Sequence, residues 1–120
     1  MSNHPYHIAL IGSKNSMNDS IAEILDSQDD LKVITFENSQ QLNASKIKPN
    51  AIIANLSTLP GKSHQILKTV KEQNDDCSII AIHFFKDLKI INALKKDGAD
   101  LYLNAEMNED ELLKAIRSVI

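Results

Sequence analysis

The stretch AIIAN, residues 51–55, is an apolar run that ends abruptly in one polar residue, Asn55. It lies between Pro49 and the turn sequence LPG at residues 59–61. A short, uninterrupted apolar run bounded in this way is typical of a strand that is buried on both faces. Such strands belong to parallel sheets with helices on both sides. The run therefore predicts a parallel α/β architecture, for which the rest of the chain must supply the other elements.

Similar apolar runs alternate with longer amphipathic segments along the chain. We predict strands over residues 8–11, 31–36, 51–55, 78–83 and 100–103. We predict one helix capped by Asn15 or Ser16, one over residues 39–47, and three more capped by Ser63, Asp87 and Asn108. Glu111 completes a capping box with Asn108. The apolar residues that give these segments their helical spacing are Ile21, Ile24 and Leu25; Leu42 and Ile47; Ile66, Leu67 and Val70; Leu88, Ile91 and Leu94; and Leu112, Ala115, Ile116 and Val119.

Strict alternation of strand and helix limits the possible topologies. Right-handed crossovers between parallel strands lead to a flavodoxin-like (βα)5 doubly wound sheet with strand order 2-1-3-4-5. Ligands and chemistry in such sheets lie beyond the carboxyl ends of the strands. Here those ends are residues 12–14, Asn55, residues 83–84 and residues 104–106.

Composition fits a single soluble domain of 120 residues, with 42% hydrophobic and 24% charged residues. A net charge of −3 gives no general attraction to nucleic acid or to acidic membranes, so neither is expected as a direct partner. Cys77 is the only cysteine, which excludes an internal disulfide and favours a reducing, cytoplasmic location. The sequence shows neither a signal peptide nor an apolar run long enough to span a bilayer.

Several segments resemble response-regulator receiver domains, which are CheY-like, and most closely those of the NarL/FixJ type. SIIAIH at residues 78–83 resembles the fourth strand of the family, and GADLYL at residues 98–103 resembles its Gly-Ala-Asp-Gly-Tyr-Leu. DELLKAIRSV at residues 110–119 resembles the closing helix, and residues 48–55 and 59–61 resemble the run into and past the phosphoacceptor. The resemblance covers nearly the whole chain and implies one receiver domain over residues 1–120.

The resemblance also implies a set of chemical groups that this sequence does not carry. Receivers use an acidic pair that binds Mg²⁺, a phosphoacceptor aspartate, a Ser/Thr switch residue and a lysine. The residues at those positions are Gly12 and Ser13, Asn55, His83 and Ala105, and only Tyr102 keeps its family role as the aromatic switch. An amide cannot form the acyl phosphate that an aspartate forms. This comparison implies a pseudo-receiver that is no enzyme and has no phosphorylation site, metal or cofactor.

Individual residues allow alternative interpretations. Asn55 either mimics one signalling state or, as we favour, hydrogen-bonds loop backbone. His83 is either a pH sensor or an ordinary polar residue at a strand end. Together with Glu106 it gives only weak evidence for a metal site. Alternation places at most one ring of Phe84 and Phe85 in the core, so that the other is exposed near a partner-binding face, unless both pack locally. Tyr102 either swings beside His83 or is a half-buried residue of an edge strand.

Two functions follow. The first is a signalling domain of the two-component type that binds a protein partner, or a second copy, through its fourth helix, fifth strand and fifth helix. It would also suit the N-terminal regulatory part of a DNA-binding transcription regulator. The second is a module that senses a neutral or weakly polar ligand in the space left by the acidic site. A flavoenzyme is disfavoured, because the chain has no tryptophan and residues 12–16 lack the glycine pattern of a phosphate loop.

Overall fold

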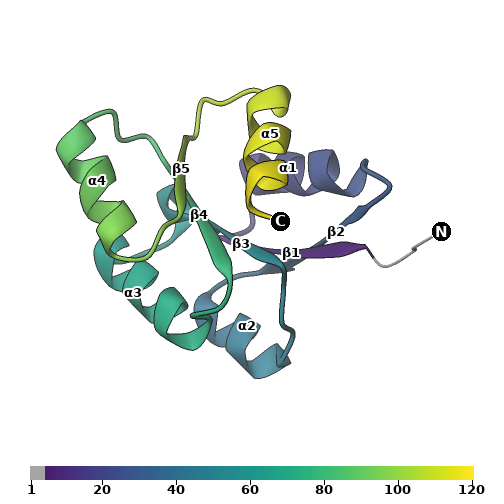
Figure 1. The fold of residues 1–120 in the computed structure, drawn as a ribbon, viewed down its shortest axis with the longest axis horizontal. Helices are drawn as coiled ribbons and strands as arrows, with labels where there is room; N and C mark the ends of the chain where they lie inside the picture. Colours follow the sequence, from purple (N-terminus) through teal and green to yellow (C-terminus); the bar gives the residue numbers. More distant parts are fainter. Residues whose placement is uncertain (1–4) are drawn as a thin grey trace.

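A computed structural model describes residues 5–120, which form a five-stranded parallel sheet between two layers of helices (Figure 1). The strands are β1 (Tyr6–Ile11), β2 (Leu31–Phe36), β3 (Ala51–Asn55), β4 (Ser78–His83) and β5 (Leu101–Asn104). The helices are α1 (Ser16–Asp26), α2 (Ser39–Ser45), the 3-10 turn η1 (Leu56–Thr58), α3 (Ser63–Gln73), α4 (Leu88–Lys96) and α5 (Glu109–Val119). The strand order is β2-β1-β3-β4-β5, so the predicted flavodoxin-like topology is confirmed.

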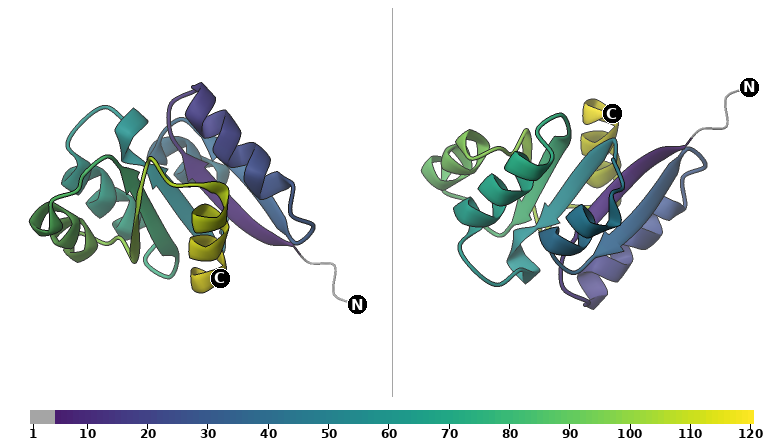
Figure 2. Two further views of the ribbon diagram at one scale, coloured as in Figure 1. Left: turned by 90° about the horizontal axis from the view of Figure 1, so that it is seen from above. Right: turned by 90° about the horizontal axis from the view of Figure 1, so that it is seen from below.

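The sheet separates two apolar cores because successive strand residues point to opposite faces. Ile52 and Ala54 of β3 face the core shared with α2, α3 and α4, whereas Ala51 and Ile53 face the core shared with α1 and α5. Figure 2 shows α1 and α5 on one side of the sheet and α2 and α3 on the other. This two-sided burial explains why the central strands are continuous apolar runs.

Most predicted boundaries hold to within two residues. β1 begins two residues earlier than predicted, and β5 lies one residue later. The shift of β5 arises at Asp100, whose carboxylate accepts the Ile79 N–H at 2.8 Å, so that the regular ladder begins at Leu101. α2 ends at Ser45 rather than at residue 47, because Lys46 adopts a left-handed conformation with φ 58°.

The helix caps confirm most of the predicted signals. Asn15 caps α1, Asp87 caps α4, and Asn108 and Glu111 form the capping box of α5. Ser63 was the wrong residue for the cap of α3: it lies inside the helix, and the N-cap is Lys62, which makes no side-chain cap bond. Gly98 ends α4 with φ 133°, a conformation that residues with a Cβ avoid.

α4 differs most from the prediction. Leu94 is buried as expected and Ile91 is half-buried, but Leu88 begins the helix with 72% of its surface exposed. The helix packs against α3 and β5 at the edge of the sheet, so its first turn projects beyond the core (Figure 1). None of the helices within residues 5–120 has the length and apolar character of a transmembrane segment.

Candidate functional site

The carboxyl ends of β1 and β3 lie next to each other because these strands pair directly, with Ile11 opposite Ala54. Gly12 and Ser13 follow β1, and Asn55 ends β3, so the sheet brings together the residues that the resemblance assigned to an acidic pair and a phosphoacceptor. His83 ends β4 and is paired with Asn104 of β5. Because β4 and β1 flank β3 on opposite sides, His83 and Gly12 lie on opposite sides of Asn55. The order of the strands therefore creates two clusters, one around Asn55 and one around His83.

Asn55 is completely buried, and its side chain forms hydrogen bonds with other side chains. Its Nδ2 donates to Asn18 Oδ1 at 2.7 Å and lies 3.2 Å from the sulfur of Met17. Its Oδ1 accepts from the Ser57 hydroxyl at 2.5 Å. The interpretation that the Asn55 side chain bonds loop backbone was wrong, because its hydrogen-bond partners are side chains of α1 and η1.

Asn18 is the central residue of this arrangement and has only 6% of its surface exposed. Besides accepting from Asn55, it donates through Nδ2 to the Ser13 carbonyl at 2.7 Å and to Thr58 Oγ1 at 3.2 Å. Sequence reasoning missed both Asn18 and Thr58. The available signal was that Asn18 occupies the same helical face as Ile21 and Leu25, which is an unusual place for a polar residue without a buried partner.

Thr58 joins the loop after β1 to the end of β3. Its hydroxyl accepts from the Ser13 backbone N–H at 3.2 Å and donates to the Asn55 carbonyl at 3.0 Å. Its own carbonyl accepts from the Ser13 hydroxyl at 2.6 Å. Ser13, Asn18, Asn55, Ser57 and Thr58 are called the amide network below.

Gly12 provides the space that the amide network occupies. A Cβ built on Gly12 would lie 2.5 Å from Asn18 Nδ2 and 2.8 Å from Thr58 Oγ1, both closer than real Cβ contacts. An acidic side chain, or any other residue with a Cβ, at this position would therefore collide with the Asn18 amide unless that amide moved. The absence of a side chain at Gly12 therefore leaves room for the Asn18 amide and the Thr58 hydroxyl.

The amide network consists of neutral groups that satisfy one another. Every buried side-chain nitrogen and oxygen within residues 5–120 has a hydrogen-bond partner. Mg²⁺ requires hard oxygen ligands, above all carboxylates, whereas the network offers amides and hydroxyls that are already engaged. These residues do not fit a Mg²⁺ site. Across the described part of the chain, no three His, Cys, Asp or Glu side chains gather in a way that could hold a metal ion.

The second cluster lies at the end of β4. The Phe84 N–H donates to His83 Nδ1 at 2.8 Å, and the imidazole stacks on Phe85 with 4.0 Å between ring centroids. The Tyr102 hydroxyl lies 2.7 Å from the His83 carbonyl and 2.8 Å from the Phe85 carbonyl. Burial lowers the pKa of His83 and raises the pKa of Tyr102. Tyr102 is thus a half-buried residue of the edge strand β5, and its hydroxyl is anchored to the loop after β4.

The two phenylalanines divide as alternation predicted. Phe85 is half-buried against the core of α2, α3 and α4, whereas Phe84 has 50% of its surface exposed. Ala105, which the resemblance assigned to the position of a lysine, packs against the core of α1 and α5. Glu106 faces Lys86 at 3.6 Å, so its nearest charged partner is an ammonium group and not a metal-binding set.

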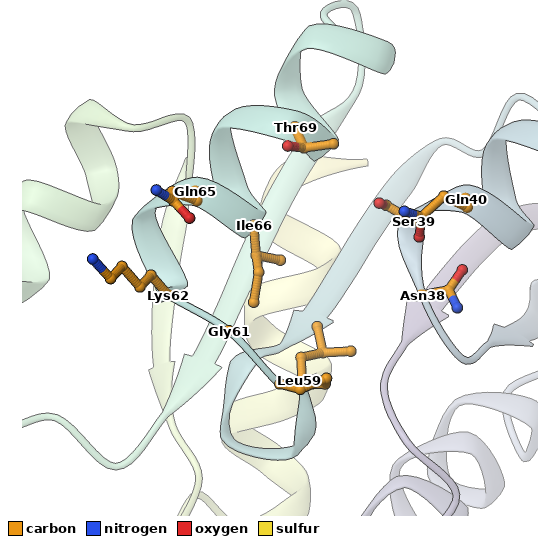
Figure 3. Close-up of a pocket in the computed structure, with 10 residues that line it drawn as sticks. Asn38, Ser39, Gln40, Leu59, Gly61, Lys62, Gln65, Ile66 and Thr69 are labelled. Atoms are coloured by element: carbon orange, nitrogen blue, oxygen red, sulfur yellow. The ribbon is translucent and has the colours of Figure 1, made fainter.

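The hollows of this surface lie beside Asn55 and not at it. One of them, whose lining residues are drawn in Figure 3, lies between α2 and α3 and has a volume of about 420 Å³. It is lined by Asn38, Ser39, Gln40, Leu59, Pro60, Gly61, Lys62, Gln65, Ile66 and Thr69. A smaller hollow of about 160 Å³ borders Gly12 and Asn18 on the side of β2. A third hollow, of about 250 Å³, lies between α1 and the start of α5 and is bordered by Met17 and Ala105. Asn55 itself is enclosed, so a small ligand would lie beside it and not against it.

Comparison with known proteins identifies the architecture. The chain is similar to the chemotaxis response regulator CheY4 of Vibrio cholerae, with a TM-score of 0.82, 18% identity, and 97% of this chain and 99% of that chain covered. For full-length FixJ from B. japonicum the TM-score is 0.80 with 22% identity, covering 97% of this chain and 58% of that chain. The signal receiver domain of a NarL regulator from Mycobacterium tuberculosis gives 0.82 and 13%, covering 96% and 95%.

Sequence comparison adds nothing further, since no family model and no curated protein matches the chain. At these identities the structural matches establish the fold alone. That fold is the receiver fold of two-component response regulators, and it places Asn55 at the carboxyl end of the central strand.

Proposed function

We propose that this chain is an atypical receiver domain of a two-component signalling protein, which works by protein–protein contact and is not phosphorylated. One observation carries the proposal: Asn55, at the phosphoacceptor position, is fully buried and held inside a neutral hydrogen-bond network. A receiver with this site has no chemistry of its own and functions as a cytoplasmic interaction module.

Phosphoryl transfer depends on a positioned nucleophile and on cations that neutralise the phosphate oxygens. Asn55 presents an amide to Asn18 and Ser57 instead of a carboxylate to solvent. Position 105 holds a half-buried alanine, so no lysine ammonium follows β5 at that point. Nucleophile, metal site and counter-charge are therefore all replaced.

We expect no phosphorylation when the protein is incubated with acetyl phosphate and Mg²⁺. The variant Asn55→Asp is also expected to remain unlabelled, because Gly12 and Ser13 still provide no carboxylate for the metal. Intact-mass spectrometry measures the outcome, with a receiver domain that has a complete acidic site as the positive control. Stoichiometric labelling of the natural chain, or of Asn55→Asp alone, contradicts the proposal.

The output surface that we propose is centred on α4 and includes β5 and α5. Phe84, Leu88 and Ile90 are three of the four large hydrophobic side chains that are exposed within residues 5–120. Lys86, Lys89, Lys95 and Lys96 are exposed in the same segment, so the apolar residues have a basic border. Exposed apolar residues with a polar rim are typical of protein interaction sites. The occupant is a protein partner or a second copy of the domain.

Substituting Leu88→Ser should weaken association without unfolding the protein. Leu88 is 72% exposed, so its removal costs little folding free energy, whereas an apolar anchor at an interface contributes about 1–2 kcal/mol, or roughly tenfold in affinity. Sedimentation equilibrium over a range of concentrations measures self-association, and urea unfolding checks stability. Tyr6→Ser, which removes the other large exposed hydrophobic side chain, is the matched control. An unchanged monomer–dimer equilibrium in Leu88→Ser rules out this surface for the homodimer.

A further inference from the structure

A titratable imidazole accepts one of the hydrogen bonds that hold the loop between β4 and the output surface. His83 ends β4, and the next residues, Phe84 and Phe85, lead into α4. Because His83 Nδ1 accepts the Phe84 N–H at 2.8 Å, this nitrogen carries no proton, and the single ring proton must be on Nε2. The neutral form of the ring is therefore built into the conformation of the loop.

Protonation would remove this hydrogen bond. An imidazolium has an N–H on both nitrogens, so turning the ring cannot supply another acceptor for the Phe84 N–H. The other contacts of the loop tolerate the charge. The stack of His83 on Phe85 becomes a cation–π contact, and the Tyr102 hydroxyl bonds the carbonyls of His83 and Phe85 and not the imidazole. Protonation thus acts on Phe84 and leaves Phe85 and Tyr102 in place.

The charges around His83 allow this titration. The neighbouring titratable groups are Lys86 and Asp87 in the same loop, Tyr102 on β5, and Glu106 after β5. Lys86 and Glu106 face each other at 3.6 Å and largely offset one another. η1, on the other side of β4, contributes no ionisable side chain. The pKa of His83 is lowered by burial, and none of these charged groups contributes to that shift.

We propose that protonation of His83 releases Phe84 from the loop, so that mild acid changes the shape of the α4 output surface. This inference rests on the proposed function, since it concerns regulation of the same surface. The sign follows from linkage. Burial lowers the pKa of His83, so the closed loop is fully formed above the ordinary pKa of about 6.5 and is lost as pH falls through the lower pKa of the folded protein.

An NMR titration of the free protein from about pH 7.5 to 5 tests the release and keeps most carboxylates ionised. We expect the Phe84 amide resonance and the His83 ring carbons to move with one midpoint below about 6.5. Corrected amide exchange at Phe84 should rise about tenfold across the transition, as expected for loss of one hydrogen bond. The amides of Phe85 and Tyr102 should shift far less.

Two variants assign the effect. His83→Asn keeps an acceptor near the Phe84 N–H but does not titrate, so its Phe84 amide should be independent of pH. His64→Asn, which replaces an exposed histidine on α3, should behave like the natural chain.

A Phe84 amide that stays fixed while His83 titrates overturns the inference, as does a transition that persists in His83→Asn. If His83→Asn fails to fold, the natural chain still tests the inference, because the midpoint of the Phe84 amide shift must equal the midpoint of the His83 ring-carbon shift. The NMR titration is carried out without a partner, so a negative result contradicts release of the loop but not the proposal that α4 forms the output surface. A negative result with Leu88→Ser contradicts that surface but not release of the loop.

Discussion

Asn55→Asp is expected to lower the free energy of unfolding by about 3 kcal/mol at neutral pH, although it differs from the natural residue by a single functional group. The carboxylate loses the N–H that Asn55 donates to Asn18 Oδ1, and two oxygens then face each other across the 2.7 Å contact. The site is completely buried, and no member of the amide network is a cation that could offset the charge.

The pH dependence of this variant follows from the same contact. Burial and the facing oxygen raise the pKa of the introduced carboxyl group, because the protonated form can donate to Asn18 again. A group that binds its proton more tightly in the folded state costs less stability in acid, so the deficit should grow as pH rises from about 4. Urea unfolding at pH 5 and pH 8 measures both effects.

The control for this experiment is Asn92→Asp, which makes the same change at an exposed position of α4. We expect it to alter stability by less than about 0.5 kcal/mol at either pH. Equal effects at positions 55 and 92 would mean that the network around Asn55 does not contribute to folding.

The architecture could be predicted from the sequence because the patterns that indicate its strands and helix caps are local. Continuous apolar runs such as residues 51–54 are typical of strands with both faces covered. The caps at Asn15, Asp87 and Asn108 depend on neighbours three residues away or fewer. The errors occur where a local signal competes with position in the fold. Leu88 has the spacing of a core residue, but it lies on the first turn of a helix at the edge of the sheet.

Only half of the candidate site could be predicted from the sequence, because its contacts join distant parts of the chain. Asn18 lies 37 residues from Asn55 in sequence, and Thr58 lies 45 residues from Ser13. The residue types at positions 12, 13, 55 and 105 predicted which groups of a receiver site are missing. They could not predict that Asn18 and Thr58 fill the space, since that depends on the pairing of β1 with β3 and on the position of α1 beside these strands.

Gly12→Ala should destabilise the domain by about 1–3 kcal/mol, a cost typical of overpacking. The added methyl group would lie 2.5 Å from Asn18 Nδ2 and 2.8 Å from Thr58 Oγ1, so the network must move to accept it. Asn18→Ala should itself cost about 1–3 kcal/mol, because Asn55 Nδ2 and the Ser13 carbonyl each lose a partner. The informative measurement is the double variant Gly12→Ala/Asn18→Ala.

The double variant should be more stable than the sum of the single effects predicts, by about 1 kcal/mol, because removing the Asn18 amide makes room for the methyl group. Pairing Gly12→Ala with Asn108→Ala, which removes the distant cap of α5, should be additive within about 0.5 kcal/mol. Additivity in both pairs would separate Gly12 from the network. Non-additivity in the first pair alone would show that Gly12 and Asn18 form one structural unit, so that an acidic residue could return to position 12 only if Asn18 were replaced with it.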